Sequence, residues 1–197
     1  MARKQLHLSQ DPAADALLTE DPLALLIGMQ LDQQFAMDRA FRGPYVLLQR
    51  LGSLDVSTIA TRADLKELFA TPPVIHRFPG SMAGRVQDLC RHIVDEYDGD
   101  AERLWKEAKT GDEVLARLQA LPGFGKQKAQ IFLALLGKQY GVRPKGWREA
   151  AGAYGEDGSF RSIADVTGPD TLLKVRAYKQ SVKAAAKAAA TNESHAL

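Results

Sequence analysis

The residues best suited to chemistry lie in residues 121–129, which read Leu-Pro-Gly-Phe-Gly-Lys-Gln-Lys-Ala. One apolar helical pattern stops at the start of this segment and a second begins directly after Gly125, which predicts a helix, a glycine-rich hairpin and a helix. Glycines at Gly123 and Gly125 allow positive φ and a close approach of the backbone to a ligand. Free N–H groups at the start of the second helix, beside Lys126 and Lys128, favour an anion such as a phosphate. The alternative is an ordinary helical hairpin with a glycine turn.

Bulk properties limit the kinds of protein that could carry this hairpin. A chain of 197 residues can form one or two small domains. Because the formal net charge is only +2, a surface for nucleic acid would have to be local. The single cysteine, Cys90, excludes a disulfide framework and any zinc or iron–sulfur site built from four cysteines. The polar N-terminus and short apolar runs predict a cytoplasmic protein without a signal peptide.

The elements that must position the hairpin are predicted to be helical throughout. Residues 23–31 are apolar on nearly all sides and predict a central buried helix, which Asp21 and Pro22 would begin. No β-alternation of useful length occurs, so the expected fold class is all-α. Further helices are predicted over residues 41–51, 61–69, 82–97, 101–109 and 112–120.

The amino-acid composition changes after the helix that follows the hairpin. Residues 141–170 are rich in glycine and predict a loop-rich connector with short helical turns. A last helix is predicted over residues 170–190, and residues 191–197 are predicted to be a disordered tail. The last helix carries a basic stripe made of Arg176, Lys179, Lys183 and Lys187. The stripe could follow phosphates or could simply be a solvated face.

Two further segments, both before the hairpin in the sequence, bear on its function. Residues 21–34 hold the buried helix and end in Asp-Gln-Gln, and residues 78–85 form a turn into a helix that reaches Arg85. With the hairpin, these segments make residues 21–140 resemble the helix-hairpin-helix DNA glycosylases of the endonuclease III superfamily. The nearest resemblance is to an actinobacterial-type group that lacks the iron–sulfur cluster.

The resemblance implies two helical subdomains with a DNA-binding cleft between them. Residues 21–140 would form a six-helix-type domain that contains the hairpin, and residues 1–20 with 141–190 would form the second subdomain. It also implies a base excision repair protein that holds double-stranded DNA by its backbone, without reading sequence, and flips a damaged or mismatched base out of the stack. We expect a monomer that associates with the nucleoid and has no membrane contact. No cofactor is expected, apart from a monovalent cation that carbonyls of the hairpin could hold.

The family's roles can be carried to matching positions of this chain. Gln33 or Gln34 would fill the gap that the flipped base leaves; a pair of surface glutamines at a helix end is the alternative. The other expected DNA contacts are Gly123, Gly125, Lys126, Lys128, Arg85, Lys179 and Lys183. Trp147 and Tyr154 could stack on the extruded base, with core packing as the alternative.

Two positions depart from the family's pattern. Gln127 stands where bifunctional members have a nucleophilic lysine, and an amide cannot form the Schiff base that lyase chemistry needs. The family has an aspartate roughly twenty residues beyond the hairpin, and this chain has Lys-Gly-Trp there, at residues 145–147. A lysine is positively charged, so it cannot stabilise a cation. The sequence therefore predicts a monofunctional DNA N-glycosylase with a displaced carboxylate.

Three carboxylates could replace the missing aspartate. Asp32 is the first candidate, because burial beside Gln33 would raise its pKa and suit it to acid–base chemistry. Glu149 is the second and Asp157 is more remote, and each could instead be a helix cap or a solvated charge. Two other hypotheses remain open: a catalytically inactive module that recognises distorted or lesion-bearing DNA, and a helical protein that uses the hairpin for protein contacts.

Overall fold

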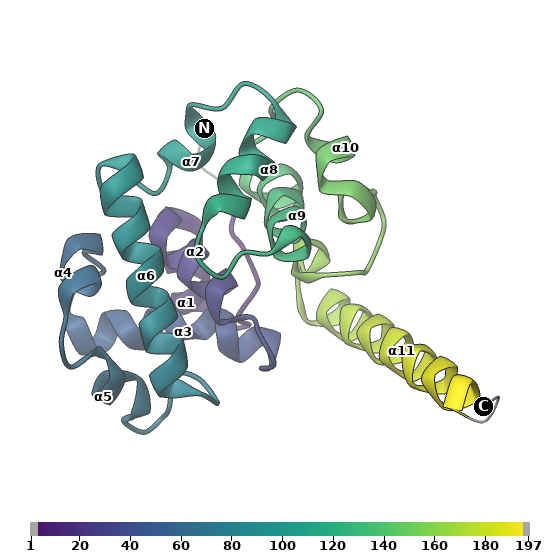
Figure 1. The fold of residues 1–197 in the computed structure, drawn as a ribbon, viewed down its shortest axis with the longest axis horizontal. Helices are drawn as coiled ribbons and strands as arrows, with labels where there is room; N and C mark the ends of the chain where they lie inside the picture. The colour runs from purple at the N-terminus through teal and green to yellow at the C-terminus, as the bar shows by residue number, and fades with distance from the viewer. Residues whose placement is uncertain (1–3, 195–197) are drawn as a thin grey trace.

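The computed structural model describes residues 4–194, with side chains described through residue 189. Within these residues the regular structure is helical, and no strand occurs beyond an isolated bridge between Thr110 and Lys145 (Figure 1). The predicted all-α class is confirmed. The α-helices are α1 (Pro12–Glu20), α2 (Pro22–Leu31), α3 (Met37–Leu51), α4 (Val56–Thr61), α5 (Leu65–Ala70), α6 (Pro79–Tyr97), α7 (Arg103–Lys106), α8 (Gly111–Ala120), α9 (Lys126–Leu135), α10 (Trp147–Ala151) and α11 (Pro169–Ser194). A π-helix, η1 (Leu136–Tyr140), and two 3₁₀ turns, η2 (Gly152–Gly155) and η3 (Ile163–Asp165), complete the set.

The first two helices begin at the same sequence signal. Asp11 caps α1 by accepting from the backbone N–H groups of its first turn, at 3.0 and 3.3 Å, and Asp21 caps α2 in the same way at 2.8 and 3.2 Å. In each helix a proline follows the aspartate at the first helical position, where its missing N–H costs nothing. The start of α2 was predicted, whereas α1 was not, although its Asp-Pro signal is identical.

Helix α2 is the centre of the hydrophobic core. Every residue from Leu23 to Leu31 is buried, and the helix packs against α1, α3 and α6. Gly28 permits a close approach to α3, because a Cβ at this position would lie 2.7 Å from the ring of Phe41. The predicted central buried helix is confirmed.

Several helix boundaries differ from the prediction. Helix α3 begins at Met37 and α6 at Pro79, each earlier than expected, and α7 covers only Arg103–Lys106. Helix α4 was not predicted as a separate element. Its six residues span less than two turns, so they show no helical periodicity in the sequence.

One hydrophobic cluster runs through the described residues from Leu6 to Val175. Helix α1 packs on α2 and α3, while α10 packs on α8 and α9. The segments on either side of residues 21–140 therefore find their main contacts on different parts of the molecule. The predicted division into two subdomains stays a prediction.

Helix α11 is anchored at its start and then leaves the body of the molecule (Figure 1). Leu172 and Val175 are buried, but every described side chain from Ala177 to residue 189 is exposed. The helix continues to Ser194, so the tail predicted to be disordered is helical over residues 191–194; residues 195–197 lie outside the described part. Alanine-rich composition extends the helix where a frayed end was expected.

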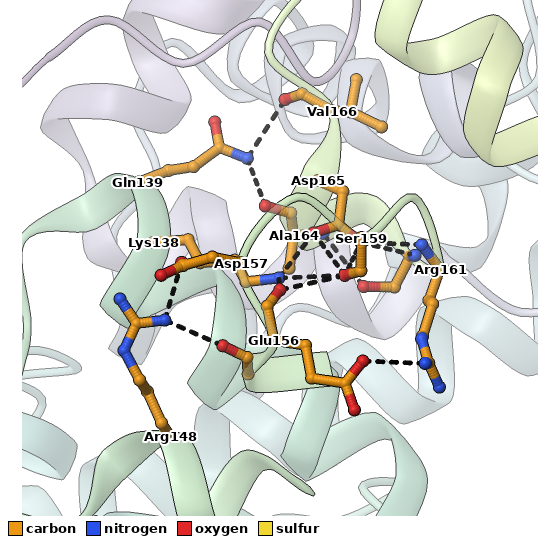
Figure 2. Close-up of polar contacts among 12 residues, drawn as sticks. Lys138, Gln139, Arg148, Glu156, Asp157, Ser159, Arg161, Ala164, Asp165 and Val166 are labelled. Carbon is orange, nitrogen blue, oxygen red and sulfur yellow. Dashed lines mark hydrogen bonds and ion pairs between the residues drawn. The ribbon is translucent and has the colours of Figure 1, made fainter. Parts of the chain in front are cut away.

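A buried ion pair holds the connector that follows η1 (Figure 2). The Lys138 ammonium contacts the Asp165 carboxylate at 2.6 Å, and the two side chains are only 10% and 4% exposed. The same carboxylate accepts from the Ser159 hydroxyl at 3.2 Å and from the backbone N–H groups of Arg161 and Ser162 at 2.8 and 3.2 Å. This network fixes the loop between η2 and η3 against the end of α9 and η1.

We expect the variant Asp165→Asn to lower the free energy of unfolding by about 3–5 kcal/mol, because it leaves the Lys138 ammonium buried without its counter-charge. The matched control is Asp157→Asn, which breaks the exposed pair with Arg148 and should cost far less, because solvent screens that pair. Urea denaturation followed by circular dichroism measures both. Equal costs for the two variants would contradict the expectation.

Candidate functional site

The hairpin between α8 and α9 is anchored by one aromatic side chain. Phe124 is buried, with its ring edge-on to Phe132 at 6.1 Å between centroids, while Gly123 and Gly125 on either side are exposed. Gly123 has φ +81°, a left-handed conformation that L side chains rarely adopt. The inward phenylalanine therefore turns the two glycine peptides outward.

The first turn of α9 faces solvent without a side-chain cap. Gly125 is the N-cap residue and has no side chain, whereas the N-caps of α1, α2, α4 and α8 each accept from backbone N–H groups. Uncapped N–H groups at a helix start carry a partial positive charge and suit an anion. Lys126, exposed in the same turn, adds a full charge. The predicted order of helix, glycine-rich turn and helix is present as α8, residues 121–125 and α9.

The hairpin forms one side of a cleft with a volume of about 830 Å³. Four regions distant in the sequence meet there: the turn after α2, the hairpin with the start of α9, the segment from η2 to Arg161, and the exposed face of α11. Its lining residues include five cationic side chains and one carboxylate, namely Lys126, Lys128, Arg161, Lys179, Lys183 and Asp32. The cleft is therefore a strongly basic surface on a chain whose net charge is only +2.

Asp32 is the carboxylate of this cleft. It ends α2 as the C-cap residue, and within the described residues its side chain makes no hydrogen bond or close ion pair. Burial raises the pKa of Asp32 above its ordinary value of 3.8, and the nearby charges of Lys179 and Lys128 offset only part of that rise. A carboxylate with a raised pKa that faces an open cleft is suited to proton transfer.

Lys128 connects α9 to the end of α2. Its ammonium donates to the carbonyl oxygen of Gln30 at 3.2 Å and lies 5.5 Å from the ring centroid of Phe124. Burial lowers the pKa of Lys128 to about 8, against the opposing attraction of Asp32. The contact places the ammonium at the negative end of α2, where a cation is favourable.

The turn after α2 is held by a buried histidine. Nδ1 of His76 accepts from the backbone N–H of Phe78 at 3.0 Å, so Nε2 carries the proton and donates to the carbonyl oxygen of Gln33 at 3.2 Å. The Gln33 side chain accepts from Arg85 at 2.5 Å, and Gln34 is exposed with φ +52°. Both glutamines line the cleft, with Gln34 as the more exposed of the two.

Helix α11 supplies the opposite side of the cleft. Tyr178, Val182 and Ala186 recur at four-residue steps and line it together with Lys179 and Lys183. The lysines were predicted, but the apolar neighbours were not. Their spacing was a usable signal, because residues four positions apart lie on the same face of a helix.

Most of the sequence-predicted residues meet in this cleft, and a few do not. Tyr154 lines it and accepts a hydrogen bond from the Gln127 side chain at 2.8 Å. Arg85 contacts Gln33 from behind without lining the cleft. Trp147 is buried against Gly137, where an added Cβ would lie 2.2 Å from its ring, so it serves the core packing that was weighed as its alternative.

The remaining candidate carboxylates lie elsewhere. Glu149 is exposed on α10 and does not line the cleft, and Asp157 pairs with Arg148 at 2.7 Å. Lys145, where the resemblance would place an aspartate, bridges to Thr110 at the far end of α8 from the hairpin. Of the three carboxylates considered, Asp32 alone lines the cleft.

A buried amide lies directly beneath the hairpin. Gln30 is fully buried, and neither polar atom of its side chain has a hydrogen-bond partner in the protein. A Cβ at Gly123 would lie 2.5 Å from the Gln30 Nε2, so this glycine permits the contact between α2 and the hairpin. An unpaired buried amide costs stability, so the position is not explained by folding alone.

The described part of the chain contains no group of three or more His, Cys, Asp or Glu side chains arranged to hold a metal ion. Among the same residues, no helix combines the length and the apolar character needed to cross a membrane. No protein-family model, curated protein or solved structure matches this chain.

We expect Gln30→Met to raise the free energy of unfolding by about 1–3 kcal/mol, because it removes a buried amide that lacks partners while nearly keeping its volume. The control is Gln139→Met, which removes an amide that donates to the carbonyls of Ala164 and Val166 at 2.8 and 3.1 Å. The control should destabilise the protein. Thermal and urea unfolding compare the two; a destabilised Gln30→Met would show that the amide is satisfied.

Proposed function

We propose that this chain is a DNA-binding base excision repair protein and a monofunctional DNA N-glycosylase that uses Asp32 as its carboxylate. The observation that carries the proposal is that Asp32, the two glutamines of the following turn and the glycine hairpin all line one basic cleft. Each group suits one step of base removal: holding the backbone, filling the gap in the stack, and cleaving the glycosidic bond.

Backbone binding rests on the hairpin. Uncapped N–H groups at the start of α9, the exposed glycine peptides and Lys126 offer a phosphate both hydrogen bonds and charge. Lys179 and Lys183, across the cleft on α11, would contact phosphates further along the strand. None of these groups distinguishes one base from another, so binding would be independent of sequence.

Insertion into the duplex rests on the turn after α2. Gln34 is exposed at the mouth of the cleft, and its neighbour Gln33 is held by Arg85 and His76. A rigid turn with an exposed amide can enter the space of a flipped nucleotide and offer hydrogen bonds to the base left opposite. Tyr154 presents an aromatic ring inside the same cleft and could stack on the extruded base.

Bond cleavage rests on Asp32. The C1′–N bond breaks, the base leaves with the bonding pair and takes up a proton, and water adds to C1′ after losing a proton. An ionised Asp32 can accept the proton of that water and stabilise the positive charge that develops on the sugar. The raised pKa of Asp32 makes it a stronger base than an ordinary aspartate.

One observation favours the second candidate function, a catalytically inactive module that binds distorted or lesion-bearing DNA. The positive charges of Lys128 and Lys179 both act on Asp32. The three side chains together therefore present no net negative charge to the sugar. Such an arrangement would bind a phosphate more readily than it would stabilise a cation. Both functions share the same DNA-binding surface, and they differ in whether base release occurs.

Lys126→Glu should weaken binding to every duplex sequence alike and lower the slope of log K against log salt by about one unit, because one phosphate contact is lost. Lys66→Glu, an exposed lysine on α5 outside the cleft, makes the same charge change and serves as the control. Fluorescence anisotropy with labelled duplexes at several salt concentrations measures both. An unchanged slope for Lys126→Glu would remove the hairpin from the DNA interface.

Asp32→Asn should abolish base release, while DNA binding persists or tightens because a negative charge leaves a basic cleft. The assay uses duplexes with uracil, hypoxanthine, an alkylpurine or 8-oxoguanine and scores released base, with alkali added to reveal abasic sites. Glu149→Gln, outside the cleft, should keep full activity. If Glu149→Gln loses activity and Asp32→Asn keeps it, the catalytic carboxylate is Glu149 and not Asp32. If the wild-type protein binds every lesion and releases no base, the chain is the inactive DNA-binding module.

A further inference from the structure

A second groove lies between α3 and the loop that follows α5. Its volume is about 550 Å³, and Phe35 is the one described residue that it shares with the cleft beside the hairpin. The groove is lined by arginines and apolar side chains, the main ones being Arg39, Arg42, Arg50, Val46, Val74 and Ile75. None of the hairpin or α11 residues reaches it, so it is a separate surface.

The wall of this groove is apolar and open to solvent. Val74 is 52% exposed and follows the pair Pro72-Pro73, while Ile75 is buried and fixes the loop to the core. The loop packs tightly on α3 because Gly43 has no side chain; a Cβ there would lie 3.2 Å from a methyl carbon of Ile75. Exposed apolar side chains that line a groove are typical of a binding surface.

The polar part of the groove is cationic. Its lining has three arginines and no carboxylate. The Arg50 guanidinium is held by the backbone carbonyl oxygens of Leu68, Thr71 and Pro73, the last two at 3.0 and 2.7 Å, which makes that wall rigid. Arg39 is exposed and forms no ion pair within the described residues, so its planar fork is open to a carboxylate.

We propose that this groove binds a segment of another protein in which a large apolar side chain is flanked by acidic residues. The apolar side chain would lie against Val74 and Val46, and a carboxylate would pair with Arg39 at the rim. Arg42, which also lines the groove, already pairs with Asp11 at 3.2 Å. Charge complementarity selects an acidic partner, since the lining carries cations alone. A DNA strand fits less well, because its phosphates would face the exposed apolar wall that Val74 forms.

The experiment measures binding of a short fluorescein-labelled peptide in which one phenylalanine is flanked by aspartates. Arg39→Glu and, separately, Val74→Asp should each weaken binding about tenfold or more, because the first reverses a contact charge and the second places a like charge on the apolar wall. Both side chains are exposed, so neither change disturbs the core. Lys145→Glu, an exposed lysine away from the groove, makes a matched change of charge and should leave the affinity unaltered.

Two further measurements make the outcome decisive. Methyl resonances of Val46, Val74 and Ile75 should shift on addition of the peptide, and a peptide with lysines in place of aspartates should not bind. Wild-type protein that fails to bind the acidic peptide even at millimolar concentration would overturn the proposal. The proposal would also be overturned if Arg39→Glu and Val74→Asp lost as much affinity for duplex DNA as for the peptide. That result would assign the groove to DNA. Because the hairpin cleft contributes only Phe35, failure here leaves the proposed base excision activity untouched, and the reverse also holds.

Discussion

Helix α2 is buried from Leu23 to Leu31, and the surrounding elements take their positions from that burial. An apolar helix of this kind can be stable only when other helices cover all its sides, and here α1, α3 and α6 pack directly on it. Its C-terminal end then emerges at the cleft and delivers Asp32 and the two glutamines beside the hairpin. The site therefore inherits its rigidity from the core.

This arrangement buries polar and ionisable side chains close to the hydrophobic core. The Gln30 amide lies unpaired beneath Gly123, and the pKa values of Asp32 and Lys128 are both shifted toward their neutral forms by burial. By contrast, the buried Lys138–Asp165 pair is fully surrounded by hydrogen-bond donors and acceptors (Figure 2). Asp32 and Lys128 line the cleft, whereas the Lys138–Asp165 pair fixes a loop, which accords with a binding role for the former and a structural role for the latter.

Local signals account for what could be predicted about the fold. Apolar spacing identified α2 and most of the longer helices, and the glycine and proline positions identified the hairpin. Helix α4 was not predicted, because six residues are too few to show a helical period. Helix α11 extends past its predicted end at residue 190 into the polar residues 191–194 that follow its alanine-rich part. The groove beside Arg39 was not predicted at all, since α3 and the loop at Val74 are separate in sequence and meet only in the fold.

The sequence by itself determined the helical class, the central helix and the hairpin, because each depends on residues within a few turns of one another. It also named Asp32 and Gln33 as candidates and placed Asp32 ahead of Glu149. Only the tertiary structure shows which of these carboxylates lines the cleft, because packing brings the end of α2, the hairpin and α11 together and leaves α10 outside. Proximity between distant segments is set by how the helices cover each other, and no local pattern records it.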